Sequence, residues 1–144
     1  FTTEARRKKE GSLGKKSEFV DYYFPLRSKT KLIIETGIEI HRKLGSGFLE
    51  IVYKDAFEYE FHSQGIQYER EKKYEVRYKN VILPHKFYAD FVVFDKVILE
   101  VKAKEGIAPE DMAQTINYLK CSGCKVGLIL NFGKNRLEIK RVVF

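Results

Sequence analysis

Residues 88–104, with the sequence YADFVVFDKVILEVKAK, constrain the fold more than any other part of the chain. Two apolar runs flank a short polar turn, a pattern that predicts two antiparallel β-strands in a buried sheet. Three charged residues interrupt these runs, namely Asp90, Glu100 and Lys102. A charged side chain among apolar neighbours loses hydration, which is costly unless a partner compensates. The stretch therefore predicts a polar site on a strand pair, and a metal ion is one partner that would satisfy all three side chains.

The length of the turn decides whether Asp90 lies beside Glu100 and Lys102. The latter two are two residues apart, so both project from one face of a strand. A two-residue turn at 95–96 pairs position 90 with position 101 and places Asp90 on the opposite face. A three-residue loop, or a bulge, brings the three side chains together. We predict the second arrangement, because it alone gives these charges common partners.

The three side chains, once together, predict metal-assisted chemistry. Two carboxylates and a strand carbonyl, such as that of Val101, are the hard oxygen ligands that Mg²⁺ prefers. A lysine beside them can position an attacking water or offset the charge of a phosphorane-like transition state. The alternative is a structural salt bridge between Asp90 and Lys102 across the strands, with Glu100 exposed at an edge.

The rest of the chain predicts one α/β domain with a mixed sheet. At 144 residues the chain has the length of a single domain with its own core. Apolar residues at helical spacing predict helices over 28–45 and 48–65. Pro109 at the start, with Glu110 and Asp111 in the first turn, predicts a helix over 108–123. Alternating or continuously apolar patterns predict strands over 66–79, 125–133 and 136–144, with a hairpin at 79–84.

The net charge of +7 is concentrated near the N-terminus. Residues 1–31 contain nine Lys or Arg and four acidic residues, whereas the rest of the chain carries a net charge of only +2. We predict that residues 1–29 form a basic arm that binds the phosphates of nucleic acid by counterion release. The expected contacts come from Arg6, Arg7, Lys8 and Lys9. The alternative is a solvated terminal tail without a partner.

The cysteine content and the hydropathy of the chain indicate the cellular compartment in which we expect the protein. Cys121 and Cys124 form a lone Cys-x-x-Cys pair, and the chain has no further cysteine to complete a four-thiolate zinc or iron–sulfur site. We expect them to be small apolar residues between a helix and a strand. Two unpaired thiols fit a reducing compartment. No apolar run approaches the roughly 20 residues of a membrane span, and no signal sequence is evident, so we expect a cytoplasmic protein without a membrane partner.

Several segments carry a resemblance to a known family. The stretch LGSGFLEIVYKDAFEYEF resembles the GxxExxY proteins, with Gly47, Glu50 and Tyr53 at the positions that name that family. The resemblance continues, in the same order, through YADFVV, VILEVKA, AQTINYLKCSG, VGLILNFG and IKRVV, so it covers about residues 30–144. Asp90 followed by Glu100-Val101-Lys102 resembles the signature of the PD-(D/E)xK nuclease superfamily, although the proline of that signature is absent here.

The resemblance implies a restriction-endonuclease-like fold in residues 30–144 and a metal-dependent nuclease activity on DNA. It implies that Asp90 and Glu100 bind Mg²⁺ or Mn²⁺ and that Lys102 is the catalytic lysine. It also implies that Glu50, on the helix before the sheet, is a further carboxylate directed at the metal. The alternative for Glu50 is a surface acid that pairs with a lysine one helical turn later.

Two residues of the last helix match the Gln-x-x-x-Tyr pattern of recombination-exonuclease-like branches of the superfamily. Gln114 and Tyr118 are four residues apart, so they share one helix face and could reach a phosphate or orient Lys102. The alternative is a polar helix face with a tyrosine in the core. Lys104 is placed with Tyr118 and the basic arm among the predicted contacts to nucleic acid.

Two classes of function remain open on the sequence. The first is a Mg²⁺- or Mn²⁺-dependent phosphodiesterase that acts on DNA. The second is a non-catalytic domain that binds nucleic acid or a protein partner and retains the nuclease fold. A binding domain has no need of the complete set of Asp90, Glu100, Lys102, Glu50 and Gln114, which favours the enzyme. Either class is compatible with a homodimer or a larger complex.

Overall fold

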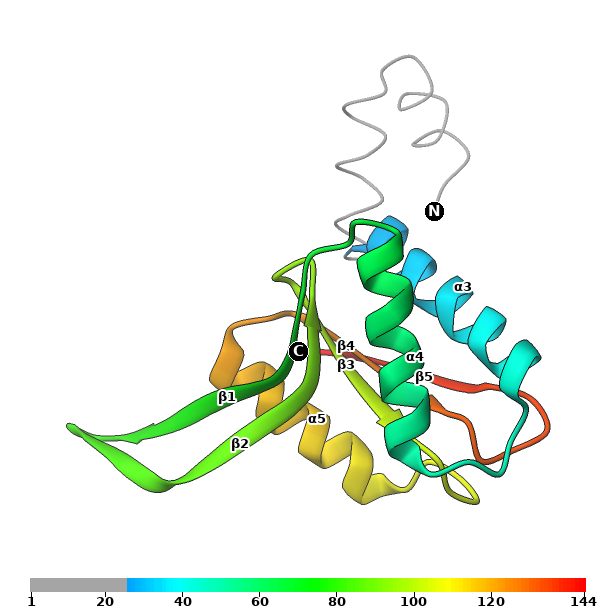
Figure 1. Ribbon diagram of the computed structural model, residues 1–144. Helices are drawn as coiled ribbons and strands as arrows, with labels where there is room; N and C mark the ends of the chain where they lie inside the picture. The colour runs from blue at the N-terminus through cyan, green and yellow to red at the C-terminus, as the bar shows by residue number, and fades with distance from the viewer. Residues whose placement is uncertain (1–25) are drawn as a thin grey trace, which may run out of the picture.

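The computed structural model describes residues 26–144 (Figure 1). This part of the chain contains helices and strands in the order α3 (Arg27–Leu44), α4 (Glu50–Ser63), β1 (Tyr68–Tyr78), β2 (Val81–Val93), β3 (Val97–Lys102), α5 (Pro109–Ser122), β4 (Val126–Asn131) and β5 (Glu138–Val143). Most of the predicted basic arm, with Arg6, Arg7, Lys8 and Lys9, lies outside the described residues. None of the described helices combines the length and the apolar character needed to cross a membrane.

The five strands form one mixed sheet in the order β1-β2-β3-β4-β5. Strands β3 and β4 are parallel, and α5 connects them, whereas the other neighbours are antiparallel. A parallel pair needs a crossover connection, which explains why the longest segment between consecutive strands of the sheet is helical. The predicted α/β domain with a single mixed sheet is confirmed.

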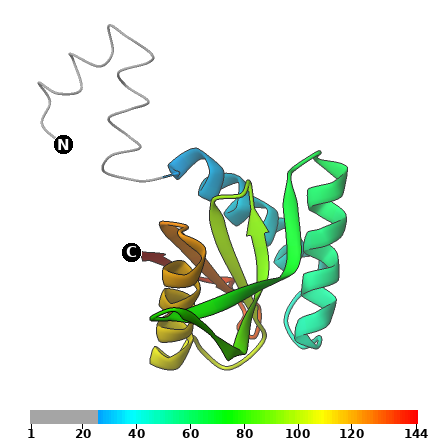
Figure 2. The ribbon, with the colours of Figure 1, turned by 90° about the vertical axis from the view of Figure 1, so that its left-hand side faces the viewer.

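Helices cover both faces of the sheet, as Figure 2 shows. Helices α3 and α4 bury one face, with a core that includes Tyr53, Phe57, Phe91 and Leu128. Helix α5 buries the other face through a second cluster that includes Tyr118, Leu119, Ile98 and Ile129. Burying a large apolar side chain contributes about 1.5–3 kcal/mol. Strands β3 and β4 are covered on both sides, which is why their sequences are continuously apolar.

The loop between β2 and β3 has the predicted three residues. Val93 pairs with Val97, and Phe91 pairs with Leu99. The two positions next in this register are 90 and 100, so Asp90 and Glu100 face each other across the strands. Phe94 and Asp95 both adopt positive φ values of 58° within this loop. The expected turn geometry is therefore confirmed.

The strand β2 is longer than predicted. It begins at Val81, so the expected hairpin over 79–84 shrinks to a tight turn at Lys79 and Asn80. Since β2 pairs with β3 only from Phe91 onward, the outer parts of β1 and β2 have only each other as partners. They extend from the sheet as a two-stranded ribbon (Figure 1). Pro84 is tolerated in this ribbon because its strand lacks a second neighbour there.

Candidate active site

Asp90 and Glu100 bridge β2 and β3 where the backbone ladder between these strands ends. The backbone N–H of Asp90 donates to the Glu100 carboxylate at 2.7 Å, and the N–H of Val101 donates to the Asp90 carboxylate at 2.8 Å. Each side chain thus satisfies a buried amide that the ladder leaves free. Both carboxyl groups are buried, with Glu100 only 2% exposed. The two predicted metal ligands are therefore held together by the strands themselves.

The Glu100 carboxyl lies in a setting that disfavours its charge. Burial, and then the nearby Asp90 carboxylate, raise the pKa of Glu100 well above its usual value, and Lys102 and Lys54 offset this only in part. A buried acid with a like charge beside it gains stability from a proton or from an added cation. The site accordingly has a deficit of positive charge.

We predict that Glu100→Gln stabilises the metal-free protein and flattens its pH dependence. An acid whose pKa is raised on folding takes up a proton in the folded state, so the parent loses stability as pH rises from the usual to the raised pKa. The loss is about 1.4 kcal/mol per pH unit across this window. A glutamine at this position is neutral and keeps the oxygen that accepts from Asp90. Thermal unfolding in EDTA across this pH range measures the difference.

The matched control for this prediction is Glu105→Gln, which removes a carboxylate from an exposed loop position. It should unfold with the pH profile of the parent. An identical pH profile for the parent and Glu100→Gln would contradict the assignment of a destabilised charge to Glu100.

Lys54 is a member of this site that the sequence prediction missed. Its ammonium donates to the Asp90 carboxylate at 3.0 Å and also pairs with Glu71, although only 9% of the residue is exposed. Burial alone would lower the pKa of Lys54, but the hydrogen bonds to Glu71 and Asp90 outweigh it and the pKa is raised. Lys54 therefore stays charged and offsets part of the negative charge at Asp90.

Glu71 reaches Lys54 from a distorted position of β1. Its neighbours Arg70 and Lys72 pair with Phe91 and Ala89, so Glu71 lies opposite Asp90, and its φ is +53°. A non-glycine residue in this region is strained, and such strain concentrates at functional sites. Sequence patterns carry no signal for a left-handed residue within a strand, which is why Glu71 was not predicted.

Glu50 begins α4 and lies within electrostatic reach of the same charges. Burial, and then the Asp90 carboxylate, raise its pKa, whereas Lys102 and Lys54 act in the opposite direction. Glu50 stands in the first turn of α4, where its side chain is partly buried. The structure thus places Glu50 at the rim of the site rather than on the free surface.

The other positions of the GxxExxY pattern shape the loop that precedes Glu50. The hydroxyl of Tyr53 donates to the Gly45 carbonyl at 2.7 Å and accepts from the N–H of Phe48 at 3.2 Å. Gly47 adopts a φ of +112°, which side chains rarely permit. The Tyr53 ring stacks on Phe132 at 4.5 Å between centroids. Tyr53 and Gly47 therefore hold the entry to α4, in agreement with the packing role expected for Tyr53.

Lys102 is held from the side of α5. Its ammonium donates to the Gln114 side-chain oxygen at 3.4 Å and lies 3.9 Å from the Asp111 carboxylate. Asp111 also pairs with Lys104 and accepts from the N–H of Ala108 at 2.8 Å. Burial would raise the pKa of Asp111, but these interactions lower it. Gln114 is thus beside Lys102 as predicted, whereas Asp111 is a neighbour that the sequence prediction missed.

Tyr118 does not lie open to solvent beside Gln114. It is 4% exposed and packs edge-to-face against Phe87 at 5.7 Å between centroids. The structure thus has the core tyrosine of the alternative interpretation, and little of its surface could contact nucleic acid. Burial is the main cause that raises the pKa of Tyr118, and the negative charges of Glu100 and Asp90 raise it further. Lys104 is exposed, as a contact to nucleic acid requires, but it is paired with Asp111.

A buried asparagine fixes the backbone that follows Lys102. The Asn131 side chain accepts from the N–H of Lys104 and donates to its carbonyl, both at 3.0 Å. The Lys102 carbonyl accepts from the N–H of Phe132 at 2.8 Å. Gly133 packs so closely that a Cβ there would lie 2.0 Å from the Lys104 carbonyl oxygen. The end of β4 therefore determines where β3 presents Lys102.

The donor set fits a hard divalent cation with few protein ligands. Within residues 26–144 no group of three His, Cys, Asp or Glu side chains is arranged to hold an ion by itself. Mg²⁺ commonly uses one or two carboxylates and keeps several waters. Asp90 and Glu100 match this pattern, and the raised pKa of Glu100 shows that added positive charge would stabilise the site. The residues therefore fit such an ion without a third carboxylate in direct contact.

A mixed sheet between helices, with two carboxylates and a lysine where two central strands end, defines a restriction-endonuclease-like domain. The family model of the PD-(D/E)XK nuclease superfamily matches residues 27–142. The chain belongs to this superfamily. The finer resemblance to the GxxExxY proteins rests on the sequence motifs.

Comparison with solved structures supports the fold. Three chains match, among them one titled "Crystal structure of SSO0001", with a TM-score of 0.52 and 15% sequence identity. The alignment covers 64% of the present chain and 48% of that chain, so the protein spans about half the length of this relative. At this identity the likeness concerns the fold alone. A search among curated proteins gave no match.

Proposed function

We propose that this protein is a metal-dependent nuclease that hydrolyses phosphodiester bonds of DNA at a site formed by Asp90, Glu100 and Lys102. The observation that carries the proposal is the pair of reciprocal hydrogen bonds that hold the two carboxylates where the ladder between β2 and β3 stops and the strands diverge. Membership in the PD-(D/E)XK superfamily supports a nuclease-type function and a nucleic-acid substrate.

The residues take distinct roles in this proposal. Asp90 and Glu100 bind Mg²⁺ or Mn²⁺ directly, with the Val101 carbonyl as a further oxygen donor, and Glu50 acts on the ion from the rim of the site through its charge. When bound, the ion supplies Lewis-acid stabilisation of the charge that develops on the phosphate oxygens. Lys102 adds a positive charge next to the phosphate and orients the attacking water.

Other residues of the proposal act on Lys102 or on the nucleic acid. Gln114 holds Lys102 in place, because its side-chain oxygen accepts from the lysine ammonium. Lys104 contacts the nucleic acid close to the site. The basic arm adds phosphate contacts from outside the described residues, through Arg6, Arg7, Lys8 and Lys9.

One observation favours the alternative of a non-catalytic binding domain. Lys54 already pairs with Asp90, so part of the charge that would attract a metal ion is satisfied within the protein. The raised pKa of Glu100 argues in the other direction, because the site still lacks positive charge. A nuclease assay on single- and double-stranded DNA and RNA, with Mg²⁺, Mn²⁺ or EDTA, separates the two functions.

We predict that Glu50→Gln reduces the cleavage rate about 10-fold, a smaller loss than removal of a direct ligand. The reason is that Glu50 lies at the rim and acts on the site through its charge. The control is Glu60→Gln, which removes a carboxylate from the last turn of the same helix. Single-turnover cleavage of the preferred DNA substrate measures both variants. Equal rates for Glu50→Gln and the parent would remove Glu50 from the proposed site.

A further inference from the structure

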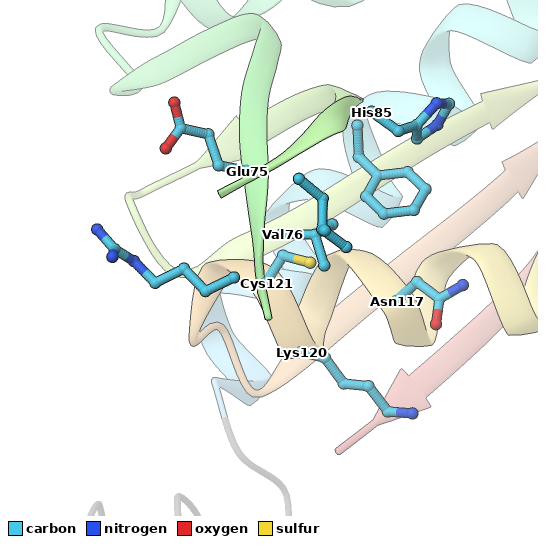
Figure 3. Close-up of a pocket in the computed structure, with 9 residues that line it drawn as sticks. Glu75, Val76, His85, Asn117, Lys120 and Cys121 are labelled. Carbon is cyan, nitrogen blue, oxygen red and sulfur yellow. The ribbon is translucent and has the colours of Figure 1, made fainter. Parts of the chain in front are cut away.

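The two-stranded ribbon and helix α5 enclose a groove outside the proposed active site. The groove has a volume of about 690 Å³. Figure 3 shows side chains of the ribbon and of α5 around it. Its lining consists of Glu75, Val76, Arg77, Leu83, His85, Phe87, Asn117, Lys120 and Cys121.

The lining combines apolar surface with hydrogen-bond donors and positive charge. Val76, Leu83 and Phe87 supply the apolar part, whereas Asn117, His85, Arg77 and Lys120 supply the polar part. Within residues 26–144 neither Arg77 nor Lys120 forms an ion pair. By contrast, Lys54, Lys102 and Lys104 at the proposed site are all paired. The groove therefore offers two cations that form no ion pair with a carboxylate of the part of the chain that the structure describes.

Glu75 does not cancel this charge. It pairs with Lys86 in the strand register, whereas the preceding residue, Tyr74, packs in the cluster beneath α5. Successive side chains of a strand point to opposite faces, so Glu75 points away from α5. Arg77 follows a register shift in β1, so this alternation does not extend to it, and it lines the groove. Figure 3 draws its carboxylate on the side of the strand away from Lys120 and Cys121.

The ribbon itself has the composition of a nucleic-acid contact. Residues 72–88 contain five Lys or Arg and a single acid, Glu75. Exposed aromatic residues lie among these cations, with Tyr78 56% and Tyr88 52% exposed. Cations that follow a phosphate backbone, together with aromatic surface for sugars and bases, characterise grooves that bind nucleic-acid strands.

The groove lies close to the proposed active site along α5. Gln114, which accepts from Lys102, lies one helical turn before Asn117 and about two turns before Lys120. At 1.5 Å per residue, the groove begins about 5 Å and ends about 10 Å from Gln114 along the helix. A nucleic-acid strand rises about 3.4 Å per nucleotide, so these distances correspond to about one to three nucleotides.

We propose that this groove binds the sugar–phosphate backbone of the nucleic-acid strand, about one to three nucleotides from the phosphate that the nuclease hydrolyses. Arg77 and Lys120 neutralise phosphates, Asn117 and His85 donate hydrogen bonds, and Phe87 contacts a sugar or base. The distance between the groove and the hydrolysed phosphate rests on the proposed nuclease function, whereas the binding of a nucleic-acid strand in the groove is independent of that function.

The test measures binding without turnover. Fluorescence anisotropy of a labelled single-stranded and a labelled duplex DNA, in EDTA, gives the affinity at several salt concentrations. The double variant Arg77→Ala/Lys120→Ala should bind at least about 10-fold more weakly at low salt, and its log–log salt slope should fall by about 1.4–1.8, for two lost phosphate contacts. The control Lys31→Ala/Lys43→Ala removes the same charge from α3, on the opposite face of the sheet, and should keep the slope of the parent.

Each outcome bears on the groove separately from the catalysis. If Arg77→Ala/Lys120→Ala keeps the parent's affinity and slope, or if the parent binds neither oligonucleotide, the groove proposal is overturned while cleavage with Mg²⁺ still tests the nuclease. If the double variant loses binding but the parent cleaves nothing, the groove proposal stands and the nuclease proposal fails.

Light scattering tests whether a second copy of the chain occupies the groove instead. If the parent is a dimer, the double variant is a monomer and both bind DNA equally, the groove is a contact between copies and the proposal is overturned. If the double variant does not fold, Lys120→Ala alone is measured, with half the change in slope.

Discussion

Replacement of Lys102 by alanine is expected to lower the rate of phosphodiester hydrolysis by at least about 100-fold, the range typical of a lost catalytic or charge-stabilising group. The substitution removes the one ammonium that Gln114 holds at the end of β3. Affinity for Mn²⁺ should be retained or increased, because a positive charge beside the carboxylates is removed. Single-turnover cleavage and calorimetric titration of Mn²⁺ measure the two effects.

The control for Lys102→Ala is Lys140→Ala, an exposed lysine of β5. It should keep the cleavage rate of the parent. Asp90→Asn, in contrast, should lose activity and metal affinity together, since it removes a negative ligand. If Lys102→Ala loses Mn²⁺ as completely as Asp90→Asn while its circular dichroism is that of the parent, the division into a catalytic lysine and metal ligands is wrong. If both variants bind Mn²⁺ like the parent, the cluster is structural and the binding-domain alternative takes precedence.

Replacement of Lys54 by methionine is expected to destabilise the metal-free protein by about 3 kcal/mol, the low end of the range for breaking a buried ion pair. The low end applies because Glu71, one of its two partners, has a side chain that is 50% exposed. The substitution keeps most of the side-chain volume and leaves the Asp90 carboxylate without its cation. Chemical denaturation at neutral pH in EDTA measures the loss, and added Mn²⁺ should restore part of it by returning positive charge to Asp90.

The matched control is Lys72→Met, which breaks an ion pair with Glu69 of nearly the same length, 2.9 Å, but on the surface. Solvent screens an exposed pair, so the stability lost by Lys72→Met should be much smaller than the loss in Lys54→Met. Equal losses for the two variants would show that Lys54 adds no more than a surface charge and does not neutralise Asp90.

Local sequence patterns were sufficient for most of the elements. Helical spacing of apolar residues located α3 and α4, because each helix buries one stripe against the sheet, and the proline and acids of its first turn located α5. Continuous apolar runs located β3 and β4, because both faces of these strands are covered. The hairpin at 79–84 was placed too broadly, since the ribbon lies outside the sheet and has little burial to mark where β2 begins.

The sequence by itself indicated that Asp90 lies beside Glu100 and Lys102, because charged residues in apolar strands need common partners, whereas the register of β2 and β3 decided that Asp90 lies opposite Glu100. The spacing of Glu100 and Lys102 placed both on one strand face, and the resemblance to the nuclease superfamily pointed to Gln114. Only the tertiary structure decided that Lys54 of α4 pairs with Asp90, that a left-handed Glu71 faces them, and that the ribbon and α5 enclose a groove. Lys54 is 17 residues from Glu71 and 36 residues from Asp90 in the sequence. The geometry of such contacts depends on how helices and strands pack rather than on any local periodicity.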